Sequence, residues 1–174
     1  MFYDYFETGL IGTLTLVGDD QGLRYIYFPK GRNTLPLKEG WRPFPGFFTE
    51  TRKQLGAYFK GELKRFDLPL APQGTPFQHR VWDALTRIPY GEVVSYKAIA
   101  EAIGNVKAVR AVGGANGKNP LPVVVPCHRV IGSSGALTGF GGGLDTKARL
   151  IDLERRHSGK SGRRPEAAPA SLRP

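Results

Sequence analysis

The sequence predicts a mixed α/β protein in which an N-terminal α/β unit is followed by a mainly helical unit. Apolar and polar residues alternate near the start of the chain, as in strands, whereas apolar residues at helical spacing dominate after residue 75. Prolines and a glycine near 70–75 separate the two patterns. We therefore expect one domain over 1–72, a second over 73–156, and a basic disordered tail over 157–174.

The composition excludes several classes of protein. The 174 residues are 40% hydrophobic and 23% charged, as in globular proteins, and no apolar run approaches the roughly 18 residues of a membrane span. The first residues lack the basic and apolar stretches of a secretory signal. One cysteine and three histidines provide neither an internal disulfide nor a conventional zinc site. We expect a soluble, monomeric, cytoplasmic protein (nucleoid-associated if prokaryotic) that needs no metal or cofactor.

The first elements predicted are strands. Alternating residues at 13–17 and 23–28, separated by turn residues at 18–22, predict a β-hairpin. After an irregular proline-rich segment and a helix, residues 63–70 are expected to form another strand.

That helix is expected over about 48–60. Its apolar face would carry Phe48, Leu55 and Phe59, and Gly61 would stop it.

The helical unit begins with a strong start signal. Thr75 is a candidate N-cap, Pro76 suits the first helical position, and Gln78 completes a capping box. Pro89 and Gly91 are expected to end this helix. Its predicted buried face consists of Val81, Trp82, Leu85 and Ile88.

Two further helices give a helix-turn-helix outline. Ser95 can cap the first, which Gly104 would stop, and the second is expected over about 106–116. The same spacing also fits an αα-hairpin in any small domain.

The second of these helices has an unusual composition, because small residues allow close approach to another backbone or to a nucleic-acid strand. Arg110 is the long cation on this surface, and Lys118 follows its end. The small residues are Ala108, Ala111, Gly113, Gly114 and Ala115.

The net charge of +10 is concentrated toward the C-terminus, with +5 over residues 75–156 and +3 over the last 18 residues. A basic surface of this kind suits a polyanion such as DNA, and it also suits a protein kept soluble by its charge.

Candidate chemistry centres on Cys127. We expect an extended apolar segment over 119–126 that leads to Cys127, His128 and Arg129. A lone cysteine is often a small buried apolar residue, but cationic neighbours favour the reactive thiolate. Because adjacent side chains on a strand point in opposite directions, Cys127 and His128 can meet only if the chain turns there.

The pentapeptide Pro126-Cys127-His128-Arg129-Val130 resembles the active-site signature of the O6-alkylguanine-DNA alkyltransferases. Further blocks are similar to the family in order and spacing, and lie at 91–96, 110–115, 119–120 and 132–143. The resemblance covers about residues 75–155. It implies an N-terminal α/β domain of ribonuclease-H type and a mainly helical, winged helix-turn-helix-like second domain.

The resemblance also implies the chemistry of transfer. Cys127 would accept the alkyl group from guanine O6, and His128 would take up the thiol proton through a water molecule. Glu154 would orient His128, and Asn119 would hold the segment that places the cysteine. Tyr96 would donate a proton to guanine N3.

Roles in binding follow from the same resemblance. Arg110 would replace the extruded nucleotide in double-stranded DNA that contains O6-alkylguanine. The other expected DNA contacts are Ser95, Ala111, Gly113, Gly114, Lys118 and Arg129. The expected base pocket is lined by Tyr96, Cys127, Val130, Phe140 and Gly141.

Three positions qualify the match. Phe140 stands where family members commonly have tyrosine, and Gly141 stands where some have serine, which affects the expected substrate preference. Lys147 falls at a position where a family lysine supports base binding, although we expect a solvated helix lysine.

The leading interpretation is a DNA repair protein that transfers a methyl or other alkyl group irreversibly to Cys127, once per molecule. A sensor that binds alkylated DNA without transfer is the alternative. A helix-turn-helix transcription regulator would carry more polar base-reading side chains on its second helix. A cysteine hydrolase would need an oxyanion hole, which the sequence does not indicate.

Overall fold

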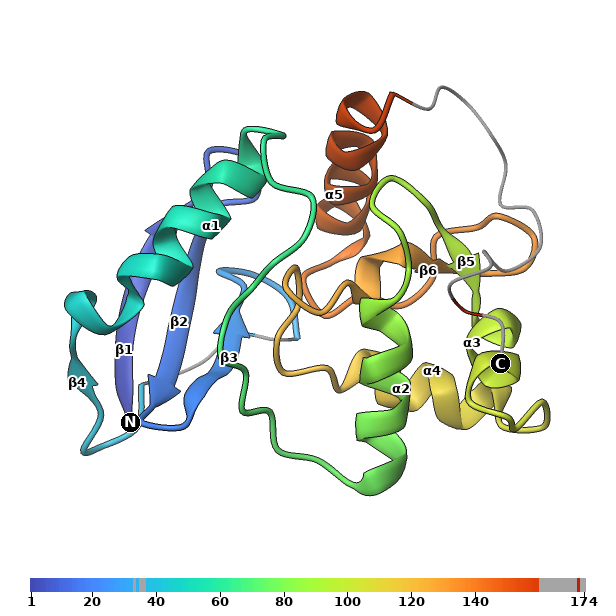
Figure 1. Cartoon of the computed structure of the whole chain (residues 1–174), viewed down its shortest axis with the longest axis horizontal. Helices are drawn as coiled ribbons and strands as arrows, with labels where there is room; N and C mark the ends of the chain where they lie inside the picture. The colour runs from blue at the N-terminus through green and yellow to red at the C-terminus, as the bar shows by residue number, and fades with distance from the viewer. Residues whose placement is uncertain (33, 35–36, 160–171, 173–174) are drawn as a thin grey trace.

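The N-terminal unit is a four-stranded sheet with a helix across one face (Figure 1). The computed structural model describes residues 1–32, 34, 37–159 and 172. The sheet order is β3-β2-β1-β4, with antiparallel pairing within β3-β2-β1 and parallel pairing of β1 with β4. The strands are β1 (Phe2–Glu7), β2 (Thr13–Asp19), β3 (Gly22–Tyr27) and β4 (Arg42–Pro43).

The predicted hairpin is confirmed, since β2 and β3 pair in antiparallel register. The first strand, β1, was not predicted, and the strand expected over 63–70 is wrong. That segment makes one isolated bridge, between Leu70 and Leu23, on the outer edge of the edge strand β3.

The helix predicted over 48–60 is confirmed as α1 (Thr49–Phe59), which follows the short 3-10 helix η1 (Pro45–Phe48). Gly61, at φ +76°, takes the left-handed backbone that ends a helix. Phe48 and Leu55 are fully buried, as expected. Phe59 is only partly buried, and its neighbour Tyr58 occupies the core in its place.

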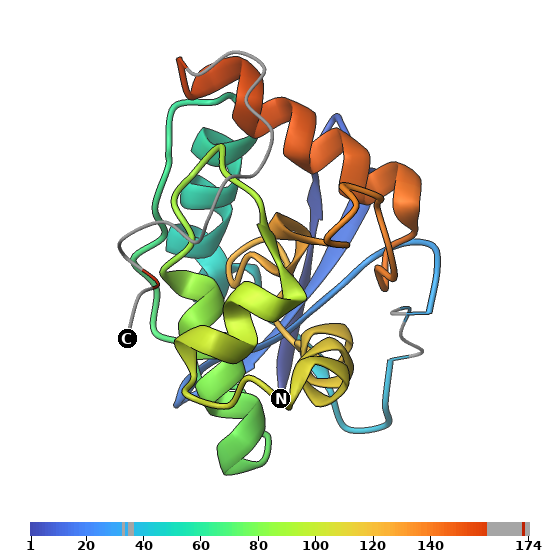
Figure 2. The same cartoon turned by 90° about the vertical axis from the view of Figure 1, so that its right-hand side faces the viewer.

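In the second unit, the first three α-helices pack against one another, and a two-stranded parallel sheet and the last α-helix complete the unit (Figure 2). The capping box of Thr75 and Gln78 is confirmed, and Ser95 accepts the amide hydrogen bond of Ala98 at the start of its helix. The elements are α2 (Pro76–Thr86), β5 (Val94–Ser95), α3 (Tyr96–Ala102), α4 (Val109–Gly117), η2 (Cys127–Arg129), β6 (Val130–Ile131) and α5 (Leu144–His157).

The extended conformation expected over 119–126 is wrong. The segment forms a compact turn in which the Val125 amide donates to the Leu121 carbonyl at 2.8 Å, and Val123 has a positive φ of 74°. The Pro120 carbonyl accepts from the Ile26 amide at 2.9 Å, which ties this turn to β3. One hydrophobic core therefore runs through both units.

The tail expected over 157–174 lies mostly outside the described residues. Leu172 is described and is fully buried, so at this position the expectation of an unpacked tail is wrong.

Candidate active site

Cys127 stands at the start of the 3-10 turn η2, directly before His128 and Arg129. The turn allows His128 and Arg129 to reach the same carboxylate from neighbouring positions. Asn119 braces the preceding loop, because its side chain donates to the Val125 carbonyl at 2.8 Å and accepts from the Leu121 amide at 3.0 Å.

Glu154, from α5, is the centre of a buried polar cluster. His128 Nε2 lies 2.7 Å from Glu154 Oε1, and the Arg129 guanidinium binds both carboxylate oxygens at 2.9 Å. Tyr58 donates its hydroxyl to Oε1 at 2.8 Å, and the Gly91 amide donates to Oε2 at 3.3 Å. Burial alone would raise the pKa of Glu154, but His128 and Arg129 hold it well below the usual range.

This cluster fixes the tautomer of His128. An ionised carboxylate only accepts hydrogen bonds, so His128 Nε2 carries the proton that points at Glu154. Nδ1 is then a lone-pair acceptor, and within the described residues this buried atom has no protein partner. Burial lowers the pKa of His128, so a neutral imidazole is available as a base.

The thiol of Cys127 is held in its neutral form. Its residue is 4% exposed, and burial raises the pKa of the thiol to about 11, although Asn119 and Lys147 act in the opposite direction. A reaction at neutral pH therefore requires that the proton leave as the sulfur attacks. The next residue, His128, has a buried Nδ1 without a partner among the described residues.

Lys147 is completely buried, so the expectation of a solvated helix lysine is wrong. Its ammonium donates to the carbonyls of Val130 at 2.5 Å and Thr138 at 2.8 Å, which ties α5 to β6 and to the loop before Gly139. Burial lowers the pKa of Lys147 to about 8, against the opposing effect of Cys127.

A narrow pocket of about 10 Å³ opens beside Cys127. Phe140 and Gly141 line it, as expected, together with Asn119. The other lining residues are Phe28, Asn116, Gly117, Pro122 and Gly139.

Two residues expected to line the base pocket do not line this narrow pocket in the described structure. Val130 is fully buried in β6, where its carbonyl is bound by Lys147. The Tyr96 hydroxyl donates to the Thr138 carbonyl at 3.3 Å, which places it next to the glycine-rich loop rather than in the lining of the closed pocket.

The expected DNA-binding residues separate into two groups. On α4, Arg110, Ala111, Gly114 and Lys118 are exposed, while Val112 and Ala115 are buried, so the small-residue surface faces outward.

The remaining expected DNA contacts lie less openly. Gly113 is half-buried, and a Cβ there would lie 3.9 Å from the Tyr96 ring. Ser95 is half-buried and caps α3. The expected DNA contact of Arg129 is not supported. The residue is 6% exposed, and its guanidinium is bound to Glu154 and to the Ile88 carbonyl, which leaves it unavailable to DNA.

Sequence reasoning missed three residues of the site. Tyr58 reaches Glu154 from α1, and the Asn116 amide donates to the Cys127 carbonyl at 3.4 Å. Phe28, which follows β3, lines the pocket beside Cys127. Two of them come from the N-terminal unit, and no local pattern relates them to a site about 70 to 100 residues further along the chain.

Neither a metal site nor a membrane span is indicated. Across the described ranges, no three His, Cys, Asp or Glu side chains gather as a metal ion requires. No helix in the same ranges is long and apolar enough to cross a membrane.

Comparison with known proteins identifies the family. Residues 1–72 match the ribonuclease-like domain of 6-O-methylguanine DNA methyltransferase, and residues 76–156 match its DNA binding domain. A methylated-DNA–protein-cysteine methyltransferase of Methanosarcina acetivorans is 53% identical over 154 residues, which is 88% of this chain and 98% of the relative. A protein of the same name from Mycolicibacterium paratuberculosis is 55% identical over 148 residues, which is 85% and 89% of the two chains.

Solved structures agree with these relatives. A crystal structure of Mycobacterium tuberculosis OGT in complex with DNA has a TM-score of 0.84 and 48% identity, covering 90% of this chain and 94% of that one. The Mycobacterium tuberculosis O6-methylguanine methyltransferase structure has a TM-score of 0.82 and 46% identity, over 97% and 95% of the two chains. With both domains matched and more than half of the aligned residues identical to a relative that is covered over 98% of its length, this chain belongs to the 6-O-methylguanine DNA methyltransferase family.

Proposed function

We propose that this protein repairs DNA by transferring the alkyl group of O6-alkylguanine to the sulfur of Cys127. One observation carries the proposal: the pocket cysteine is adjacent to a buried histidine whose Nε2 is bound to Glu154 and whose Nδ1 has no partner among the described residues. Relatives about half identical to this chain are named methylated-DNA–protein-cysteine methyltransferases. Family membership and site geometry therefore support the same reaction.

In the proposed reaction, each proton and each electron pair that moves has a donor and an acceptor. The thiol proton passes through a water molecule to His128 Nδ1 while the sulfur attacks the alkyl carbon in line with the C–O6 bond. As that bond breaks, its electron pair goes to the purine, and Tyr96 supplies a proton at N3 so that guanine leaves neutral. The carboxylate of Glu154 stabilises the imidazolium that forms at His128.

The product explains why each molecule acts once. Alkylated Cys127 is a thioether, whose C–S bond has no low-barrier route back to a thiol. The protein is therefore consumed in proportion to the lesions that it repairs.

DNA binds across the exposed face of α4 in this proposal. Arg110 enters the base stack in place of the flipped nucleotide, and Lys118 contacts phosphate. Ala111 and Gly114 allow the helix to approach the duplex closely, because they present little or no side chain. We propose further that the protein acts as a monomer on chromosomal DNA in the cytoplasm.

The alternative of a sensor that binds alkylated DNA without transfer has no specific observation in its favour. Such a protein does not need an acceptor thiol, whereas Cys127 lines the pocket and directly precedes the buried His128 in η2. The transfer reaction accounts for both features.

The test is an intact mass measurement after incubation with an oligonucleotide that contains O6-methylguanine. We expect the protein to gain one methyl group, located on Cys127, without added metal or cofactor. Cys127→Ser is expected to bind the same DNA and gain no mass, because a hydroxyl is a much poorer nucleophile. An unchanged mass of the wild-type protein, or many turnovers per molecule, would contradict the proposal.

A further inference from the structure

The pocket beside Cys127 is too small, in the structure described above, for the base and alkyl group of the proposed substrate. Its volume of about 10 Å³ is close to that of a single water site, far below that of a purine base. Some part of the lining must therefore move before a base and its alkyl group can enter. Phe28 is the lining residue that comes from the N-terminal unit.

Phe28 packs directly behind the predicted base-binding loop. Its ring centroid lies 5.4 Å from that of Phe140, and the residue is 3% exposed. A Cβ at Gly142 would lie 2.8 Å from the Phe28 ring, which shows how closely the loop backbone passes. The Arg32 amide also donates to the Gly141 carbonyl at 2.9 Å. The segment after β3 therefore supports the loop from behind.

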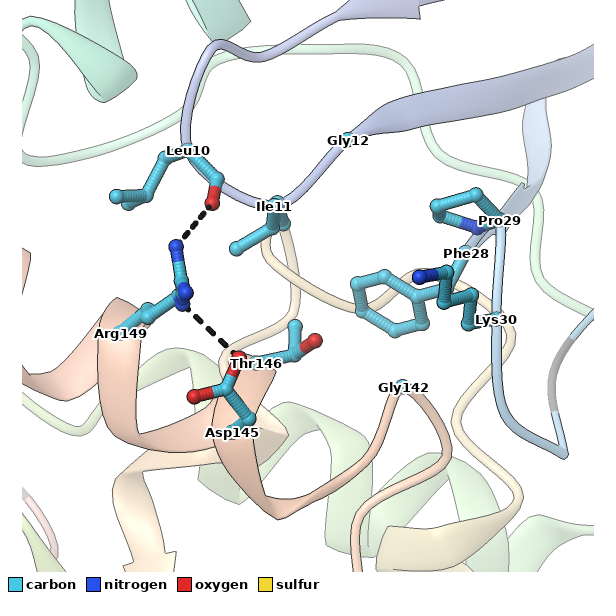
Figure 3. Close-up of a pocket in the computed structure, with 10 residues that line it drawn as sticks. All are labelled: Leu10, Ile11, Gly12, Phe28, Pro29, Lys30, Gly142, Asp145, Thr146 and Arg149. Carbon is cyan, nitrogen blue, oxygen red and sulfur yellow. Dashed lines mark hydrogen bonds and ion pairs between the residues drawn. The ribbon is translucent and has the colours of Figure 1, made fainter.

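Phe28 also lines a second cavity (Figure 3). Its volume is about 310 Å³, and Figure 3 shows the Phe28 ring between the backbone of Gly142 and the side chains of Ile11 and Thr146. Phe28 thus lines both the nearly filled pocket at Cys127 and this larger cavity. A smaller side chain at residue 28 would therefore leave space between Phe140 and this cavity.

We propose that Phe28 is a specificity-determining residue of the transfer reaction, which sets how large an alkyl group fits beside Cys127. This inference rests on the proposed function. Phe140 can retreat from an incoming alkyl group only as far as Phe28 allows, so the size of residue 28 limits the space beside the sulfur. A methyl group needs little of that space, whereas a benzyl group needs Phe140 to move toward the second cavity.

The experiment compares transfer rates from two oligonucleotides of the same sequence, one with O6-methylguanine and one with O6-benzylguanine. Single-turnover rates are measured by intact mass for the wild type, Phe28→Leu and Phe28→Ala. We expect the ratio of benzyl to methyl rates to rise about tenfold in Phe28→Leu and further in Phe28→Ala, a size of effect typical of pocket trimming. A ratio is used because a general loss of stability lowers both rates together.

The matched control is Phe6→Leu. Phe6 is a partly buried aromatic residue of β1 that stacks on Phe59 at 6.4 Å and lines neither cavity. Its ratio should equal that of the wild type. An unchanged ratio in both Phe28 variants, or an equal rise in Phe6→Leu, would overturn the assignment of Phe28. If the wild type gained neither group, the proposed function itself would fail, which is a different result.

Discussion

At the scale of single residues, Glu154 shows how a buried charge is retained in this fold. Its two oxygens accept five hydrogen bonds, from Tyr58, Gly91, His128 and twice from Arg129. Two oxygens of a carboxylate offer about four lone-pair sites, so its acceptor capacity is fully used. Any change at Glu154 leaves Arg129 buried without its counter-charge.

We therefore predict that Glu154→Gln destabilises the protein at neutral pH by about 3–5 kcal/mol, as expected when one partner of a buried ion pair is removed. It should also change the pH dependence of stability. Because the pKa of Glu154 is lowered on folding, the carboxyl group is protonated in the unfolded chain before it is protonated in the folded protein. This difference begins as the pH falls through the ordinary pKa of a carboxyl group. The stability of the wild type therefore falls with pH in this acidic range, whereas Glu154→Gln lacks the pH-dependent stabilisation that Glu154 supplies.

Urea unfolding of both proteins between neutral pH and about pH 3 measures the effect. The control is Asp152→Asn, whose carboxylate pairs with Arg156 on the surface and is 65% exposed. This variant should keep nearly the wild-type stability and pH dependence. Parallel curves for wild type and Glu154→Gln would show that Glu154 does not supply the acid sensitivity.

At the scale of elements, the outer face of α4 carries the predicted DNA contact. A Cβ at Gly114 would meet nothing within 4 Å, so the protein itself does not require glycine there. Glycine in a helix costs about 1 kcal/mol relative to alanine. Close approach of DNA is a reason to keep it.

We predict that Gly114→Leu leaves the protein at least as stable as the wild type but weakens duplex binding at least about tenfold, which corresponds to about 1.4 kcal/mol. The rate of transfer from free O6-benzylguanine should change little, because no duplex approaches α4 in that reaction. Gly56→Leu is the control, since Gly56 is also helical and a Cβ there also meets nothing within 4 Å. Equal DNA affinity in the two variants would remove α4 from the interface.

Elements with local signals were predictable from the sequence, and elements defined by partners were not. The capping box at Thr75 and the cap at Ser95 are short-range patterns, and both helices begin where expected. Residues 63–70 have strand-like composition but pair with the edge strand β3 at Leu70 alone, which the composition of the segment does not show. The strand β1 is intermediate or exposed along its whole length, so it lacks a clear buried alternation.

The same distinction applies to the candidate site. Cys127 and His128 were identified through a contiguous motif, whereas the burial of Lys147 depends on carbonyls of Val130 and Thr138 that only the tertiary structure brings together. Arg129 was assigned to DNA because the sequence does not show its buried ion pair. Its partner, Glu154, is 25 residues away in the sequence.

At the scale of the whole molecule, the N-terminal unit contributes directly to the site formed by the second unit. Three of the hydrogen bonds between them bear on the site: the Ile26 amide to the Pro120 carbonyl, the Arg32 amide to the Gly141 carbonyl, and Tyr58 to Glu154. The first two fix loops on either side of Cys127 in the sequence. The third joins α1 to the carboxylate that orients His128.

We predict that Tyr58→Phe lowers the free energy of unfolding by about 1.5–3 kcal/mol, the range for a hydrogen bond to a charged group. The aromatic ring and its packing are retained, so the loss reports on the hydroxyl alone. Glu154 keeps its bonds to His128 and Arg129 but loses one that fixes Oε1, so transfer to Cys127 should also slow. Urea unfolding and single-turnover transfer from an O6-methylguanine oligonucleotide measure the two effects.

Tyr90→Phe is the matched control for this prediction. Tyr90 packs against Tyr58 at 6.2 Å between ring centroids, and its buried hydroxyl has no hydrogen-bond partner among the described residues. Removing a hydroxyl that lacks a partner should leave stability unchanged or raise it. Similar losses in the two variants would mean that ring environment, rather than the bond to Glu154, sets the contribution of Tyr58. A loss confined to Tyr58→Phe, in both stability and transfer rate, would show that the N-terminal unit helps to position the reacting residues.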